Sequence, residues 1–210
     1  AGNIEFSSPS DFETQSNYSI TVNVSDQLNI TSQAISISLN DLNDEVPVFT
    51  SASSWTIDEN NTIVGSVTAT DQDANSTLSY TISGGDDAGA FILNANNGTL
   101  EFATAPDYET KTSYNLEVTV SDGANTASQN ITVAVNNLDD NDPIFTSPST
   151  INVLENESFI GTLTATDADG DTITFSAPTG ALIIDEITGD ISWSPTILSN
   201  NSLSNYEYYH

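Results

Sequence analysis

The sequence predicts an all-β protein built from tandem immunoglobulin-like β-sandwich repeats of about 96 residues in an elongated array. Apolar and polar residues alternate with a period of two in several segments, which is typical of half-buried strands. No segment carries the apolar stripe of an amphipathic helix. The sequence also matches itself at a constant offset, and such self-similarity indicates a repeat architecture.

The internal repeat defines the expected domains. Matching pairs at this offset include the triplets 11–13 and 107–109, the dipeptides 25–26 and 121–122, and the Asp-x-Asp motifs 71–73 and 167–169. Pro47 and Pro143 mark the starts of successive repeats. We therefore expect residues 1–45 to be the C-terminal half of one repeat, 46–141 to be a complete repeat, and 142–210 to be an incomplete or divergent repeat.

The complete repeat should contain about seven short strands, separated by clusters of Gly, Asn, Asp and Ser that suit turns. The expected strands are Trp55 to Ile57, Ile63 to Thr70, Leu78 to Ile82, Phe91 to Leu93, Thr99 to Phe102, Tyr114 to Val120 and Ile131 to Val135. Trp55 and Trp193 are expected in the core. The third repeat departs from the others after Phe175, and the sequence predicts no fold for residues 176–210.

Composition excludes several function classes. The chain has 30 acidic residues and one basic residue, Lys111, so it lacks the basic surface that nucleic acid binding requires. No apolar run approaches the roughly 20 residues of a membrane span, and the N-terminus lacks signal-peptide features, which is consistent with a mature product or a fragment. Cysteine is absent, and the single Lys and His show no triad-like arrangement with a Ser. We expect no enzyme, although a glycosidase-like carboxylate pair is a remaining alternative.

An acidic turn points to a metal. Residues 136–142 contain three carboxylates and three amides, and Pro143 and the apolar pair Ile144 and Phe145 follow at once. The acids are therefore expected on an ordered turn and not on a mobile charged segment. Oxygen ligands gathered on a short turn are what Ca²⁺ requires. Residues 40–49 are the counterpart of this turn one repeat earlier.

Five short motifs resemble the calcium motifs of cadherin repeats, in the order of that family. Glu59 resembles the XEX motif, Asp107-x-Glu109 the DXE motif, and residues 137–141 the DXNDN linker. Asp167-x-Asp169 resembles the DXD motif, and Asp122 the XDX motif. The resemblance extends at least to Phe175. The shortage of Lys and Arg and the compact repeat favour a bacterial-type extracellular cadherin domain over an animal one.

The resemblance implies that Ca²⁺ sits between repeats. The ligands of the first junction would be Asp11, Glu13, Asp41, Asn43, Asp44, Glu45, Asp71, Asp73 and Asp122. The ligands of the second would be Glu59, Asp107, Glu109, Asn137, Asp139, Asp140, Asn141, Asp167 and Asp169. Asp26 would serve a preceding junction. Glu45 stands where the family has Asn.

Electrostatics supports the same cofactor. Carboxylates that converge on one junction repel each other until a cation converts the repulsion into ligation. Extracellular modules of this kind bind Ca²⁺ at about 10⁻⁴ to 10⁻³ M, which predicts a location outside the cell or on its surface.

The leading functional hypothesis is a calcium-stiffened adhesion segment, a rod or stalk whose partners are the neighbouring repeats of the same protein. A second hypothesis is a glycan- or protein-binding accessory module that uses Tyr206, Tyr208 and Tyr209. A third is a head-to-tail filament in which residues 1–45 of one copy complete the third repeat of another. The favoured alternative to the filament is that the chain ends are arbitrary boundaries within a repeat array. Other possible partners are further copies of the chain in homophilic contacts, or a surface protein or glycan.

Overall fold

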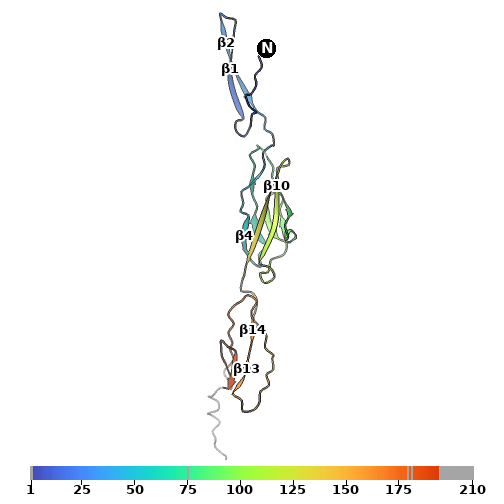
Figure 1. Cartoon of the computed structure of the whole chain (residues 1–210), viewed down its shortest axis with the longest axis vertical. Coiled ribbons are helices and arrows are strands. Elements are labelled where there is room, and N and C mark those ends of the chain that lie inside the picture. Colours follow the sequence, from blue (N-terminus) through green and yellow to red (C-terminus); the bar gives the residue numbers. More distant parts are fainter. Residues whose placement is uncertain (1, 75, 179, 181, 194–210) are drawn as a thin grey trace, which may run out of the picture. The chain divides into compact units, whose positions relative to one another are not determined.

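The computed structural model describes residues 2–74, 76–178, 180 and 182–193, and it divides into two compact units, Ala1–Asn136 and Asn137–His210. The described residues are almost wholly β-structure, which confirms the predicted fold class (Figure 1). The helical structure among them is one short 3-10 turn, η1 (Ala88–Ala90). The first unit contains residues 1–45 together with most of the predicted complete repeat.

The first unit begins with a hairpin of β1 (Asn17–Ser25) and β2 (Ile30–Ser38). The two strands pair antiparallel from Asn17 opposite Ser38 to Ser25 opposite Ile30. One repeat later, β10 (Ser113–Ser121) and β11 (Thr126–Asn136) pair in the equivalent register. The sequence repeat is therefore also a repeat of strand pairing.

The complete repeat is a β-sandwich. Besides β10 and β11 it contains β3 (Val48–Phe49), β4 (Ser54–Asp58), β5 (Ile63–Ser66), β6 (Ala69–Thr70), β7 (Ser79–Gly84), β8 (Phe91–Leu93) and β9 (Thr99–Phe102). One sheet has the order β4-β11-β10-β7, the facing sheet has the order β5-β9-β8, and β3 pairs with β6. β4 runs parallel to β11, whereas the other pairs of this repeat are antiparallel.

The core of the sandwich lies between the two larger sheets. Its most buried side chains include Leu100 on β9, Leu116 and Val118 on β10, and Ile131 and Val133 on β11. Each fully buried aliphatic side chain contributes roughly 1.5–3 kcal/mol relative to an exposed one. The apolar residues of the alternating pattern that predicted these strands are therefore the ones whose burial stabilises the fold.

Trp55 packs against this core, as predicted. The ring lies over Gly65, where a Cβ atom would fall 1.9 Å from the ring. Gly98 has φ +69°, and a Cβ atom there would lie 2.0 Å from the carbonyl oxygen of Val67. Glycine is therefore required at position 98 both by the backbone conformation and by the close approach of the backbone of Val67, which lies between β5 and β6.

The predicted strand 63–70 is two strands in different sheets. β5 pairs with β9, whereas β6 pairs with β3. Between them the Val67 N–H donates to the Gly98 carbonyl at 2.8 Å, and the Thr68 carbonyl accepts from Thr50 N at 2.8 Å. The chain thus crosses from one sheet to the other at residues 67–68, and a period-two pattern does not record which sheet a residue joins.

The second unit repeats part of this architecture. Its strands are β12 (Ile144–Phe145), β13 (Phe159–Thr162), β14 (Ala165–Thr166), β15 (Leu182–Ile184) and β16 (Asp190–Trp193). β12 pairs with β14, and β13-β16-β15 form a three-stranded sheet. These five correspond to β3, β5, β6, β8 and β9. Counterparts of β4, β7, β10 and β11 are absent from the part of the chain that the structure describes.

Trp193 differs from Trp55. It is 45% exposed, so the expectation that it lies in the core is not met within the described residues. Its indole Nε1 donates to the carbonyl of Glu157 at 3.1 Å. No described strand covers the ring, because the four-stranded sheet that faces β9 in the complete repeat has no described equivalent here.

Candidate metal centre

The predicted ligands of the first junction come from four segments of the first unit. They are the turn at 11–14 before β1, the segment 41–45 between β2 and β3, the loop 71–73 after β6, and Asp122 after β10. The turn 11–14 precedes the hairpin β1–β2 and the segment 41–45 follows it, whereas the loop 71–73 and Asp122 belong to the complete repeat. Each segment has a local reason for its conformation.

Asp11 and Asp107 form the same turn in successive repeats. Asp11 Oδ1 accepts from Glu13 N at 3.0 Å and Thr14 N at 3.2 Å, and its Oδ2 accepts from Thr14 Oγ1 at 2.8 Å. Asp107 accepts the equivalent bonds from Glu109 and Thr110 at 3.0, 3.3 and 2.8 Å. The Thr hydroxyl and the backbone N–H groups hold the pKa of both aspartates below the ordinary value. Both side chains therefore shape the turn that carries the glutamate, and a ligand role for them stays a prediction.

Seven carboxylates in the first unit form three overlapping groups, and within each group the ligand atoms lie within 4.8 Å of one another. The groups are Glu13, Asp41 and Asp73; Glu13, Asp44 and Glu45; and Asp71, Asp73 and Asp122. Glu13 and Asp73 belong to two groups each. The fold thus brings together seven of the nine residues predicted for this junction.

Burial of these carboxylates is energetically unfavourable unless a cation is bound. Asp73 is 5% exposed and Asp122 is 8% exposed. Four buried carboxylate oxygens have no hydrogen-bond partner among the described residues: Glu13 Oε1, Asp41 Oδ1, Asp71 Oδ2 and Asp73 Oδ1. An ionised carboxylate that is buried without a partner is strongly unfavourable.

The pKa values of two members respond to this environment. Burial raises the pKa of Glu13 to about 7, and Asp41 and Asp11 add to the rise. Burial also raises the pKa of Asp73, as does the charge of Asp71, although the Glu45 N–H opposes the change. Oxygen donors that resist ionisation until a positive charge arrives fit a hard divalent cation such as Ca²⁺.

Asn43 adds an amide to the same place. Its side-chain oxygen faces Asp73 Oδ2 and Asp122 Oδ2, which are both acceptors, and the flipped amide would instead donate to them at 3.1 and 2.9 Å. In the flipped orientation the Asn43 amide links the two carboxylates, which belong to the complete repeat, to the segment 41–45. A ligand role for Asn43 stays a prediction.

Backbone and amide groups fix the loops around these acids. The Glu45 N–H donates to Asp73 Oδ2 at 3.0 Å, and Asn125 Nδ2 donates to the Glu45 carbonyl at 2.9 Å. Asp122 Oδ1 accepts from Ala124 N at 2.7 Å and Asn125 N at 2.6 Å. Burial is the largest influence on the pKa of Asp122 and raises it, but the hydrogen bonds from Asn125 and Ala124 together outweigh burial and lower the pKa.

The predicted ligands of the second junction belong to different units. Glu59, Asp107 and Glu109 lie in the first unit, and the remaining six lie in the second. Glu59 is 1% exposed, and its Oε2 accepts from Tyr108 N at 2.7 Å, which holds it against the Asp107 turn. A common site for the two sets stays a prediction.

Within the second unit the linker wraps around Asp169. Asp169 Oδ2 accepts from Asp140 N at 3.1 Å and Asn141 N at 2.7 Å, and the Asp169 carbonyl accepts from Asn137 Nδ2 at 2.8 Å. The Asn141 contact reproduces the bond between Glu45 and Asp73 one repeat earlier. Asp167 Oδ1 accepts from Asp171 N at 3.4 Å.

Asp171 was not predicted. Its carboxylate lies within 4.8 Å of those of Asp139 and Asp169, and the charge of Asp139 raises the pKa of Asp171. The sequence signal was the third acid in the run from Asp167 to Asp171. The repeat comparison hid this signal, because the equivalent position one repeat earlier is an asparagine.

Sequence comparison adds independent information. Residues 53–136 match the family model of the cadherin domain. Mouse protocadherin Fat 4 is 36% identical over 154 residues, which cover 70% of this chain and 3% of the mouse protein. The Fat-like cadherin-related tumor suppressor homolog of Drosophila melanogaster is 41% identical over 113 residues, which cover 52% of this chain and 2% of that protein. The chain thus spans a few per cent of the length of these curated relatives.

Solved structures have the same fold. Mouse protocadherin-24 EC1-3 matches with a TM-score of 0.65 and 25% identity, over 91% of this chain and 71% of that chain. Mouse cadherin-23 EC22-24 matches with a TM-score of 0.65 and 22% identity, over 88% of this chain and 66% of that chain. All four relatives are animal proteins, and the bacterial-type origin stays a prediction.

The structure bears differently on the expected tyrosine surface and on the expected absence of a membrane span. Tyr206, Tyr208 and Tyr209, on which the glycan-binding hypothesis relied, lie outside the described residues. A helix of sufficient length and apolar character to cross a membrane is not found among the residues that the structure describes.

Proposed function

Because the chain is composed of cadherin-like repeats, we propose that it is a segment of a cell-surface adhesion protein in which Ca²⁺ stiffens the junctions between repeats. Cadherin domains are extracellular adhesion modules and not enzymes, and the chain is a module of this kind. The finer proposal concerns the metal and its mechanical role. One observation carries it, namely the four unpartnered carboxylate oxygens buried where residues 1–45 meet the complete repeat.

Each side of the first junction supplies part of the site. Glu13, Asp41, Asp44 and Glu45 come from the turn and linker that flank the hairpin, and Asp71, Asp73 and Asp122 come from the complete repeat. Asp73 is shared between a group that includes linker acids and a group made only of repeat acids. A bound Ca²⁺ would supply the positive charge that makes this convergence favourable.

The mechanical consequence follows from charge. When the site is empty, like charges on the two sides repel, and the segment 41–45 acts as a hinge. When the site is filled, the same carboxylates hold both sides to a common ion, and the segment acts as a strut. The partners of the segment are, first of all, the neighbouring repeats of the same protein.

Calcium titration of the metal-free chain by calorimetry tests the site. Asp73→Asn should weaken Ca²⁺ binding at least tenfold, because Asp73 serves two of the three groups. Asp86→Asn is the matched control, since Asp86 is an exposed loop aspartate outside these groups. Equal affinities for the two variants would overturn the assignment.

Small-angle scattering tests the mechanical role. We expect a single extended population in millimolar Ca²⁺ and a broader distribution of dimensions in chelator. Asp73→Asn in Ca²⁺ should resemble the parent chain in chelator. A profile that chelation leaves unchanged would rule out the strut even if Ca²⁺ binds.

A further inference from the structure

The turn between β8 and β9 combines a chemically reactive sequence with a well-defined conformation. Residues 94–99 read Asn-Ala-Asn-Asn-Gly-Thr, and Asn97-Gly98 is the only place in the chain where glycine follows asparagine. Glycine has no side chain to shield its amide nitrogen, so this nitrogen can attack the side-chain carbonyl carbon of the preceding asparagine. Asn97 is exposed to solvent, whereas Gly98 is buried. The sequence therefore places a reactive amide where the next residue is tightly packed.

The reaction open to this sequence is a deamidation that consumes water. The Gly98 nitrogen loses its proton and forms a bond to Cγ of Asn97, while the bond from Cγ to Nδ2 breaks and the NH₂ group leaves as ammonia with that proton. The product is a five-membered cyclic imide. Water then adds to one of its two carbonyl groups and opens the ring. The result is aspartate or, when the backbone continues through the former side chain, isoaspartate, and no oxidant or reductant takes part.

Hydrogen bonds of the folded turn oppose the first step. The Gly98 N–H, which must lose its proton, donates to the Asn94 carbonyl at 2.9 Å. Asn97 Oδ1 accepts from Thr99 N at 3.0 Å, which holds the side-chain carbonyl against the turn. Asn94 Oδ1 accepts from Asn96 N at 3.0 Å and Asn97 N at 3.3 Å, which fixes the backbone before the reactive pair. The attack therefore requires the turn to open.

The equivalent turn in the second unit shows which side chains this conformation accepts. There Asp185 takes the place of Asn94, and its Oδ1 accepts two backbone N–H bonds at 3.0 and 2.7 Å. Thr188 takes the place of Asn97, and its Oγ1 accepts from Asp190 N at 3.3 Å. An oxygen acceptor at each position is therefore sufficient for the turn. Aspartate at position 97 supplies such an acceptor, so this product of deamidation fits the fold.

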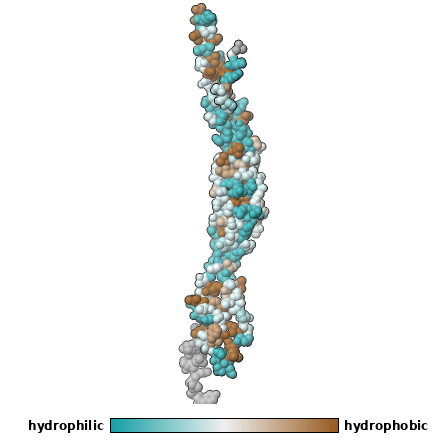
Figure 2. Space-filling model, in the orientation of Figure 1, coloured by the Kyte–Doolittle hydropathy of each residue, from teal (hydrophilic) through white to brown (hydrophobic). Residues whose placement is uncertain are grey.

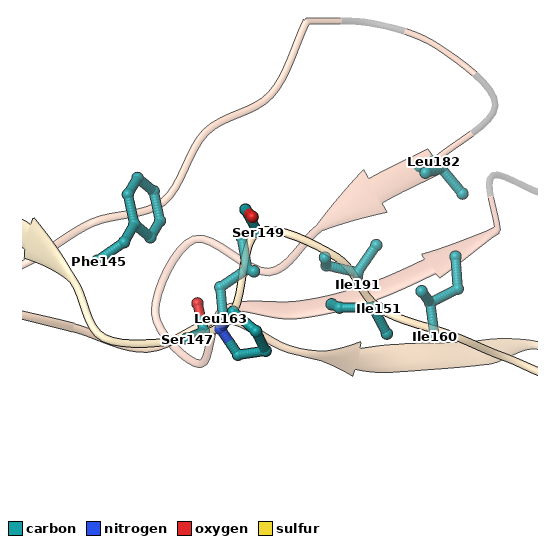
Figure 3. Close-up of a pocket in the computed structure, with 9 residues that line it drawn as sticks. Phe145, Ser147, Ser149, Ile151, Ile160, Leu163, Leu182 and Ile191 are labelled. Carbon is teal, nitrogen blue, oxygen red and sulfur yellow. The ribbon is translucent and has the colours of Figure 1, made fainter.

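Isoaspartate has a different consequence, because it lengthens the backbone by one carbon. A Cβ atom at Gly98 would lie 2.0 Å from the Val67 carbonyl oxygen, and the Gly98 carbonyl accepts from Val67 N at 2.8 Å where the chain crosses between sheets. The same bond joins Leu163 N to the Gly189 carbonyl at 2.9 Å in the second unit, where Leu163 lines an apolar pocket (Figure 3). An extra carbon immediately before Gly98 therefore moves the turn away from this crossing.

We propose that Asn97 is a spontaneous deamidation site that the folded turn keeps inactive and that local opening of the turn activates. Opening breaks the bond from the Gly98 N–H to the Asn94 carbonyl and frees the nitrogen for attack. The isoaspartate product then prevents the turn from closing on Val67, so a transient opening leaves a permanent covalent mark. The proposal does not rest on the calcium function, because it involves no predicted metal ligand.

Peptide mapping of the full 210-residue chain by mass spectrometry tests the site. Deamidation changes the mass of the peptide that contains Asn97, whereas isomerisation of the two Asp-Gly pairs, 122–123 and 169–170, leaves the mass unchanged. At mildly alkaline pH the folded chain should lose the Asn97 amide at least about tenfold more slowly than the same chain in concentrated urea. Equal rates in the folded and unfolded chains would overturn the proposal.

Two asparagines of the turn supply a matched pair of variants. Asn94→Ala removes the acceptor of two turn bonds and should raise the deamidation rate at Asn97 several-fold in the folded chain. Asn96→Ala makes the same chemical change where only the backbone N–H takes part in these bonds, and it should keep the parent rate. Asn94→Asp retains the acceptor, as Asp185 does, and should also match the parent. In urea all four chains should react equally, because the Asn97-Gly98 pair is intact in each.

Hydrogen exchange tests the effect of the product. A chain that carries isoaspartate at position 97 should lose protection at the Val67 amide, whereas Asn97→Asp should keep it. Equal acceleration by Asn94→Ala and Asn96→Ala would overturn the protective role of the turn, and full protection of Val67 in the isoaspartate form would overturn the effect of the product. If Asn94→Ala unfolds the complete repeat, the comparison of the parent chain with and without urea still decides.

Discussion

The hairpins β1–β2 and β10–β11 have the same strand pairing but different surroundings. Both pair nine residues in equivalent register. Yet Val22 and Val24 on β1 are 38% and 69% exposed, whereas Val118 and Val120, one repeat later, are fully buried. Hydrophobic side chains on the β1–β2 hairpin are visible as brown surface in Figure 2.

The difference separates two effects of the same alternating pattern. Alternation decides which side chains share a face, and it does so for both hairpins. Burial of that face depends on β4 and β7 beside the hairpin and on the sheet β5-β9-β8 opposite it, which only the second hairpin has among the described residues. Equivalent substitutions in the two hairpins should therefore have unequal effects.

The largest difference in the free energy of unfolding is expected between equivalent substitutions of a core residue and an exposed one. Leu116→Ala should lower the free energy of unfolding of the first unit by about 2–5 kcal/mol, because it leaves a cavity in a packed core. Ile20→Ala, at the equivalent position but 43% exposed, should cost less than about 1 kcal/mol. Urea unfolding followed by circular dichroism measures both, and equal costs would show that the first hairpin is covered as well as the second.

Calcium removal should affect the two regions differently. A ligand at 100 times its Kd stabilises the state that binds it by about 2.7 kcal/mol. Chelation should therefore raise amide hydrogen exchange at residues 11–14 and 41–45, and leave exchange in the core strands β9, β10 and β11 unchanged. Uniform loss of protection would mean that the metal supports the fold of the repeat and not the junction.

The tight turns of the two hairpins have different residues at a left-handed position. Gly123 has φ +99°, and its counterpart Gln27 adopts φ +82°. A left-handed conformation is easier for glycine, and nothing lies within 4 Å of a Cβ atom added at position 123. Gly123→Gln should therefore cost about 1 kcal/mol and Gln27→Gly should gain a similar amount. Thermal melts can compare the two variants. A lower stability of both variants would contradict the prediction that glycine is the more favourable residue at this turn position.

The smallest effect is a pH dependence of the metal-free chain. The pKa of Glu13 is about 7 in the fold and 4.5 in a free side chain, so the folded state binds more protons between these values. Metal-free stability should therefore fall as pH rises from about 4.5 to 7, and Ca²⁺ affinity should rise over the same interval because protons compete with the ion. Melting curves in chelator would show this slope, and Glu13→Gln should reduce it. Metal-free stability that rises with pH through this interval would exclude the raised pKa of Glu13 as the main cause of the pH dependence.

Much of the fold followed from local pattern. The strands 91–93 and 99–102 were predicted with the bounds that the structure has, because the turn residues between and around them leave little choice of bounds. The split of 63–70 into β5 and β6 was missed, since both pieces keep the same alternation while they join different sheets. The parallel pairing of β4 with β11 likewise leaves no mark in either segment.

The candidate site was predicted in part for the same reason. The motif offsets identified Glu13, Asp41 and Asp73, which do converge. The motif offsets did not reveal that Asp11 and Asp107 accept three hydrogen bonds each within a turn. A sequence does not distinguish an aspartate that stabilises a turn from one that binds a metal. Asp171 was overlooked because the comparison of repeats discards residues that only one repeat has.

By itself the sequence determined the repeat, the all-β class and the face of each strand that is apolar, and it predicted a set of ligands for a hard cation. These are properties of neighbours along the chain, and period and spacing record them. The tertiary structure alone decided which apolar faces are buried, and it decided which carboxylate oxygens lose water without gaining a hydrogen bond. Burial depends on what distant segments bring to the same place, and that is why two hairpins with one pattern have different exposure.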